Sequence, residues 1–213
     1  MIELTGLPVD VAAVAVSATL FLWHNITLQR NSHTSPQASA RGRHRVARNA
    51  WVRMVTDGEQ AILAVQTLRN WIMAATLLAS TAILLALGLI GAALGTDQSI
   101  DFTRGLNLFG EPSAGFWLFK ALALSLTYFA AFFAFSLSTR SFVHTGFMIN
   151  VARDEPDHTA ADDVIDELES GAFFYWVGIR AYYASVPMAL WLVGPLWLVL
   201  GMLGMLVLMR RVD

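Results

Sequence analysis

The sequence contains no cysteine, so it excludes disulfides, a thiolate nucleophile and a cysteine-ligated zinc site. Charge is also scarce, because charged residues make up 14% of the 213 residues against about 25% in soluble domains. The net charge is −2, and basic and acidic residues lie in separate segments. Hydrophobic residues make up 56% of the chain. This composition indicates a membrane protein, and we expect no nucleic-acid partner.

Long uncharged stretches predict an all-α integral membrane helix bundle with four transmembrane helices in a single domain, residues 1–213. About 20 helical residues cross the roughly 30 Å hydrocarbon core of a bilayer. The predicted spans are residues 7–28, 71–95, 116–140 and 183–209, and the predicted cytoplasmic segments are residues 29–70 and 141–182. The last uncharged stretch is long enough for one tilted span and too short for two. We expect Pro187 and Pro195 to kink or break it.

The second span is expected to be the continuation of a longer helix that extends into the cytoplasm. Thr56 and Glu59 match a capping box, in which the two side chains satisfy orphan N–H groups at a helix start. Arg69 and Asn70 precede an uncharged run that begins at Trp71, so we place the membrane boundary there. The charged half of the helix is then expected to stand in the cytoplasm.

Charged residues outside the spans predict two shorter helices. Arginines accumulate between residues 41 and 53 on an amphipathic helix with Trp51, Val52 and Val55 on its apolar side. These arginines either bind anionic lipid or only set the orientation of the chain. A second, acidic helix is expected from Thr159 to Gly171. Both segments fall on one side of the membrane, where their charges can neutralise each other.

The distribution of basic residues predicts the orientation of the chain. Ten of the fourteen basic residues lie between spans one and two or between spans three and four. The positive-inside rule therefore places both termini outside the cytoplasm. Asp10 suits the positive end of the first helix dipole, and Lys120 is expected to snorkel to the headgroups.

Several stretches together resemble a known family. They are Gln66 to Asn70, Met73 to Ser80, Arg140 with His144, Gly178 to Tyr183, and Leu190 to Pro195. In combination, and over nearly the whole chain, they are similar to the bacterial membrane proteins of domain-of-unknown-function family 599. The resemblance implies a multi-pass protein of the bacterial inner membrane. It implies no activity and no catalytic residues.

Polar residues near the predicted membrane boundary form the candidate ligand or pore site. They are Glu59, Gln66, Arg69, Asn70, Arg140, His144 and Arg180. Three arginines at one depth could hold an anion or a lipid headgroup, because a guanidinium donates two parallel N–H groups to phosphate or carboxylate. Alternatively, Glu59 or an acid of the segment Asp162 to Glu169 is the internal partner and the cluster is a structural latch, or each arginine snorkels alone.

Three classes of function remain open from the sequence. Scattered histidines and the lack of a carboxylate pair inside a span make an enzyme the weakest, so we expect no catalytic residue, metal or cofactor. We expect a homo-oligomeric pore or transport-type protein with a basic cytoplasmic vestibule, because the spans carry few polar residues and a pore would form between subunits. Self-association would use aromatic faces and small-residue ridges, such as Ala75, Ala79, Ala82 and Ala86 followed by Gly91 and Gly95. The alternative is a non-catalytic scaffold or accessory subunit that binds a partner or anionic lipid.

Overall fold

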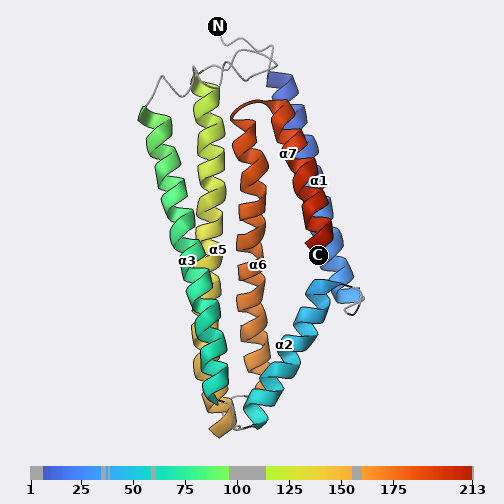
Figure 1. Ribbon diagram of the computed structural model, residues 1–213, viewed down its shortest axis with the longest axis vertical. Coiled ribbons are helices and arrows are strands. Elements are labelled where there is room, and N and C mark those ends of the chain that lie inside the picture. Colours follow the sequence, from blue (N-terminus) through green and yellow to red (C-terminus); the bar gives the residue numbers. More distant parts are fainter. Residues whose placement is uncertain are drawn as a thin grey trace. The chain divides into compact units, whose positions relative to one another are not determined.

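The computed structural model describes residues 7–34, 37, 39–58, 61–95, 114–154 and 160–212. These residues form α-helices and no strand (Figure 1). The helices are α1 (Leu7–Thr34), α2 (Ala40–Asp57), α3 (Ala61–Gly95), α5 (Ala114–Asp154), α6 (Ala161–Trp191) and α7 (Pro195–Val212). Three helices are long and apolar enough to cross a membrane, over Pro8–Arg30, Ile62–Leu94 and Gly115–Ala152. The all-helical membrane architecture is therefore confirmed.

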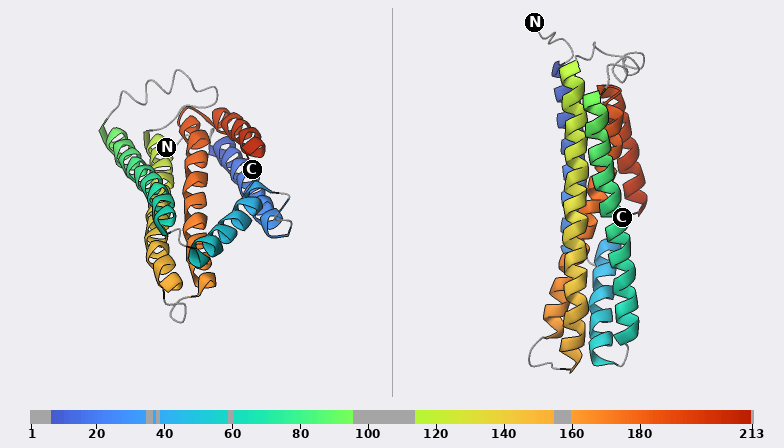
Figure 2. Two further views of the ribbon diagram at one scale, coloured as in Figure 1. Left: turned by 60° about the horizontal axis from the view of Figure 1, so that its bottom comes forward. Right: turned by 90° about the vertical axis from the view of Figure 1, so that its left-hand side faces the viewer.

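The helices belong to two compact units. Unit 1 comprises residues 1–29, 82–130 and 180–213, and unit 2 comprises residues 30–81 and 131–179. Helices α3, α5 and α6 are long and continuous (Figure 2). These three helices and the end of α1 contribute residues to both units. Each unit therefore builds its own core from segments that are far apart in the sequence.

Unit 2 contains α2 and the adjoining parts of α3, α5 and α6. The amphipathic helix predicted around residues 41–53 is confirmed as α2, with Ser39 as its N-cap, and its apolar face enters the protein core. Val52 and Val55 are fully buried beside Phe142 and Val164. Burial of these side chains removes apolar surface from water and holds α2 against the other helices.

Close packing of α6 on α5 explains two glycines of unit 2. A Cβ atom at Gly171 would lie 2.7 Å from Phe142, and one at Gly178 would lie 2.7 Å from Phe135. The prediction that Gly171 ends a short acidic helix is therefore wrong, because α6 continues to Trp191 and uses this glycine for helix contact. The predicted cap, Thr159, lies outside the described residues.

The long helix predicted around the second span is continuous, but it begins later than expected. Helix α3 passes through Arg69 without a break, and its 35 residues correspond to about 52 Å. The predicted capping box is wrong, because Thr56 lies in α2 and its hydroxyl donates to the carbonyl of Val52 at 3.0 Å. Glu59 lies outside the described residues.

The last apolar stretch is two helices and not one span over residues 183–209. Helix α6 ends at Trp191, residues 192–194 turn, and Pro195 opens α7. Proline has no N–H to donate to the carbonyl four residues back, and its fixed φ suits the first turn of a new helix. Pro187, in contrast, lies inside α6. A set of four transmembrane helices is not confirmed.

Unit 1 packs α7 against α1 and the end of α6. Met202, Leu206 and Met209 of α7 form a buried cluster with Leu20 and Phe21 of α1 packed against it. A Cβ atom at Gly201 would lie 2.6 Å from Leu190 and 3.2 Å from the backbone of Pro187. The turn at residues 192–194 thus brings α7 back along the helix that precedes it.

Candidate functional sites

Unit 1 contains a buried ion pair between two predicted spans. The Nζ atom of Lys120 lies 2.9 Å from Oδ1 of Asp10, and the two side chains are 4% and 8% exposed. The indole Nε1 of Trp191 donates to the same oxygen at 2.7 Å. Three helices, α1, α5 and α6, therefore meet at one carboxylate.

Local sequence places each member of this cluster. Asp10 lies in the first turn of α1, where the helix dipole favours a negative charge. The Lys120 ammonium lies 4.8 Å from the ring centre of Phe116 and 5.1 Å from that of Trp191, within cation–π range. The predicted snorkelling of Lys120 is wrong, because its partner and its aromatic neighbours keep it in the interior.

Further polar groups are buried in unit 1. Asp10, Ser17 and His24 are seven residues apart, so they share one face of α1. Ser17 is 3% exposed, and the Nε2 atom of His24 is also buried. Other helices of the unit contribute the buried side chains of Ser125, Arg180 and Ser185. The interior of unit 1 therefore contains several polar side chains besides the ion pair.

Most residues of the sequence-predicted site lie on the surface of their units. Gln66, Arg69, Asn70, Arg140 and His144 are exposed. Arg180 is buried and belongs to unit 1, whereas these five belong to unit 2. Their convergence in one pocket remains a prediction.

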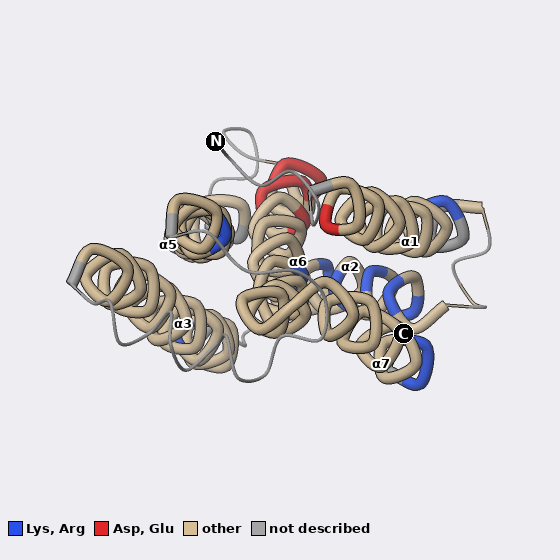
Figure 3. The backbone as a smooth tube through the Cα atoms, turned by 90° about the horizontal axis from the view of Figure 1, so that it is seen from above, with Lys and Arg blue, Asp and Glu red and all other residues tan. Residues whose placement is uncertain are grey.

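Two acidic residues of α6, Asp162 and Glu169, pair with arginines of α2. Arg48 donates Nε and Nη2 to the two carboxylate oxygens of Glu169 at 2.9 and 2.8 Å. Arg53 donates to Asp162 at 2.7 Å, at a more exposed position. Figure 3 shows acidic residues gathered at the start of α6 and basic residues on α2. The predicted neutralisation between the basic and acidic segments is confirmed for these pairs.

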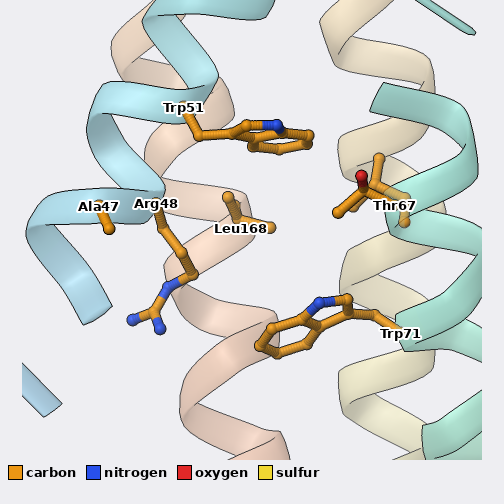
Figure 4. A pocket seen from close by; sticks show the side chains of 7 residues that line it. Ala47, Arg48, Trp51, Thr67, Trp71 and Leu168 are labelled. Carbon is orange, nitrogen blue, oxygen red and sulfur yellow. The ribbon is translucent and has the colours of Figure 1, made fainter. Parts of the chain in front are cut away.

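Unit 2 also contains an apolar cavity of about 210 Å³. It is lined by Ala47, Arg48, Trp51, Thr67, Leu68, Trp71 and Leu168. Figure 4 shows Trp51 of α2 and Trp71 of α3 extending toward the space from different helices, with Leu168 of α6 beside it. The ring of Trp71 makes an edge contact with Phe142 at a centroid distance of 5.1 Å and a tilted contact with Tyr175 at 5.5 Å.

Sequence reasoning missed both the ion pair and the cavity. The signal for the ion pair was present, since Asp10 and Lys120 are isolated charges at the ends of apolar runs. No pattern in the sequence indicated that Asp10 and Lys120 contact each other. Within the described part of the chain, no group of three or more histidine and carboxylate side chains could hold a metal ion.

Comparisons with known proteins give one match. A family model described as a protein of unknown function, DUF599, matches residues 12–213. No curated protein and no solved structure matches the chain. The family model thus covers all six helices in whole or in part.

Proposed function

This chain belongs to the DUF599 family, and we propose that it is a transport-type protein of the bacterial inner membrane that moves protons through the interior of unit 1. The observation that carries the proposal is the buried ion pair between Asp10 and Lys120. Ionisable side chains within membrane helices are costly to bury, and they commonly mark ion pathways and proton relays.

The buried polar side chains of unit 1 suit a proton better than a larger solute. Ser17 and His24 continue the face of α1 that begins with Asp10, over about 21 Å. Hydroxyl, imidazole and carboxylate groups can all accept and donate a proton. Successive groups on this face lie about 10 Å apart along the helix axis, so a narrow file of water molecules would have to carry the proton between them. The proton path would therefore lie inside one chain, whereas the sequence predicted a pore between subunits.

The exposed polar residues of unit 2 have a second role in the proposed transport protein. Gln66, Arg69 and Asn70 on α3, with Arg140 and His144 on α5, would form the basic cytoplasmic vestibule. We also propose that the protein forms homo-oligomers and acts without catalysis. The alternative, a scaffold that binds a partner or anionic lipid through α2, has less support because Glu169 and Asp162 neutralise Arg48 and Arg53.

The turn at residues 192–194 supports a cytoplasmic C-terminus, on the side opposite to the one that four spans predict. If α6 crosses the membrane, α7 carries the chain back. Its apolar run from Pro195 to Met209 measures about 22 Å, less than the roughly 30 Å hydrocarbon core, so the bilayer would have to thin around it. Adding Arg210 and Arg211 to the ten basic residues on the cytoplasmic side leaves only Arg104 and Lys120 opposite. We therefore propose that the N-terminus is outside and the C-terminus inside, where four spans would place both outside.

Proton flux in vesicles tests the function. The purified protein is reconstituted in liposomes that contain a pH-sensitive dye, and a potassium gradient with valinomycin supplies the driving force. We expect faster acidification than in empty vesicles, and a large loss of that flux in Asp10→Asn. Arg53→Gln, which alters an exposed ion pair of unit 2, is the control and should keep the wild-type rate.

The variants separate the proposal from a structural role of the ion pair. Wild-type flux no faster than that of empty vesicles would contradict proton transport. Full flux in a folded Asp10→Asn protein would show that the pair only holds the helices together. Folding of each variant is checked by its thermal unfolding before reconstitution.

A further inference from the structure

We propose that the cavity of unit 2 binds one acyl chain of a membrane phospholipid, inserted between α2 and α3. The proposal concerns residues that the proton path does not use, so it stands independently of the transport function. It assigns a ligand to the space between Trp51, Trp71 and Leu168.

The walls of the cavity select an apolar ligand. Leu68, Leu168 and the two indole rings make the walls mainly apolar, and the polar groups of the lining are the Thr67 hydroxyl, the Arg48 guanidinium and the indole N–H groups of Trp51 and Trp71. Arg48 is already committed to Glu169 through two hydrogen bonds. A charged group would therefore lose its hydration in the cavity and find no free counter-charge on these walls, whereas a hydrocarbon would bury apolar surface.

The size of the cavity suits a hydrocarbon segment. An apolar cavity of about 150 Å³ stays free of water and can hold a benzene molecule. The cavity of unit 2 measures about 210 Å³ and is partly open, so a flexible chain can enter it from outside. A chain with free rotation about each bond can also follow the irregular space between two tryptophans.

The bilayer is the source of this ligand. Thr67, Leu68 and Trp71 belong to α3, within the segment Ile62–Leu94 that can cross a membrane. Tryptophan is enriched at membrane interfaces, where lipid chains and headgroups meet. Helix α2 is not one of the candidate spans, so a lipid chain that contacts Ala47 and Trp51 has left the bulk bilayer.

Photolabelling tests this binding on the full chain. The protein is reconstituted in vesicles of phosphatidylethanolamine and phosphatidylglycerol that contain a trace of phospholipid with a diazirine in one acyl chain. After illumination, mass spectrometry locates the label. We expect label on α2, at residues 47–51, and on Leu168 of α6. Label confined to exposed side chains of the candidate spans would overturn the proposal.

A matched pair of variants distinguishes the cavity from the general surface of α2. Ala47 and Ala50 are both exposed on α2, and only Ala47 is part of the cavity lining. We expect Ala47→Trp to lose most of the label on the peptide that contains Trp51, and Ala50→Trp to keep it. Equal labelling of the two variants would contradict a cavity site. If Ala47→Trp does not fold, Ala47→Leu replaces it.

A competition experiment separates phospholipid from free fatty acid. The protein in detergent is labelled with the diazirine phospholipid in the presence of excess unlabelled phospholipid or excess unlabelled fatty acid. We expect phospholipid to remove the label on α2 and fatty acid to leave it. The reverse order would overturn the bilayer as the source of the ligand.

Discussion

Asp10 is a single carboxylate that accepts from both Lys120 and Trp191, so the loss of its charge leaves the buried Lys120 ammonium without a counter-charge. We predict that Asp10→Asn destabilises the protein by about 3–5 kcal/mol, the usual result of stranding one member of a buried ion pair. The measurement is thermal unfolding of the purified protein in detergent micelles.

The double variant Asp10→Asn with Lys120→Met is the control for this prediction. It removes both charges, and the amide oxygen can still accept from the Trp191 indole. We expect it to be more stable than Asp10→Asn alone, because replacing both members of a buried pair is often close to neutral. Equal unfolding temperatures for the wild type and Asp10→Asn would show that the ion pair contributes nothing to stability.

Two ion pairs between α2 and α6 differ in their exposure and are predicted to differ in energy. The pair of Arg48 and Glu169 is bidentate, with side chains 21% and 24% exposed, whereas those of Arg53 and Asp162 are 59% and 77% exposed. We predict a loss of about 1–2 kcal/mol for Arg48→Met, and of no more than about 0.5 kcal/mol for Arg53→Met.

Unfolding at low and high salt checks this difference. Salt screens exposed charges more strongly than buried ones, so the small effect of Arg53→Met should vanish at high salt while that of Arg48→Met remains. Similar losses for the two variants would mean that burial does not distinguish the two pairs.

At the scale of elements, the turn between α6 and α7 depends on the close approach of Gly201. We predict that Gly201→Ala destabilises the protein, because the new Cβ would lie 2.6 Å from Leu190 and 3.2 Å from the Pro187 backbone. Gly204, on the same helix, has nothing within 4 Å of such an atom. Gly204→Ala should therefore be neutral or stabilising by up to about 1 kcal/mol, the usual gain of alanine over glycine in a helix.

Thermal unfolding of this pair of variants measures the contact directly. A higher unfolding temperature for Gly201→Ala than for Gly204→Ala would contradict the packing of α7 against α6.

The small residues of helix α3 pack within the protomer. Ala75, Ala79, Ala82 and Ala86 are all buried within the chain. The ridge that the sequence offered for self-association is therefore occupied by contacts within one protomer. The self-association of the protein stays a prediction, and it has to use other surfaces, such as the exposed side chains of Leu77, Leu84 and Leu87.

At the scale of the whole molecule, the proposed orientation can be measured because the chain has no cysteine of its own. Single cysteines are placed at Thr5, Ser39, Asp163 and Asp213, and intact cells are treated with a membrane-impermeant thiol reagent. We expect label at position 5, and at the other three only after the cells are opened. Label at position 213 in intact cells would contradict the return of α7, and label at position 39 would invert the orientation.

The predicted homo-oligomer is tested by native mass spectrometry from lipid discs. We expect a species larger than one protomer, because the spans present many exposed apolar side chains that can pack between copies. A monodisperse monomer would contradict this prediction. The proton path inside unit 1 would be unaffected, because it needs only one chain.

Patterns within a short stretch of sequence determined much of this protein by themselves. The uncharged runs predicted helices α1, α3 and α5, and the arginines with Trp51, Val52 and Val55 predicted α2 and its buried face. Both properties can be read from a short stretch of sequence. The helical period decides which side chains share a face, and the hydrophobicity of consecutive residues decides whether a helix can enter an apolar medium.

Only the tertiary structure decided which distant residues meet. Asp10 and Trp191 are 181 positions apart, and nothing local distinguishes a carboxylate that serves the helix dipole from one that pairs with Lys120. The turn before Pro195 is similar, because a proline in an apolar run can kink a helix or end it. The tertiary structure ends the helix here, and the turn lets Leu198, Met202 and Leu206 of α7 pack into clusters with residues of α1 and α6, contacts that a single continuous helix could not make.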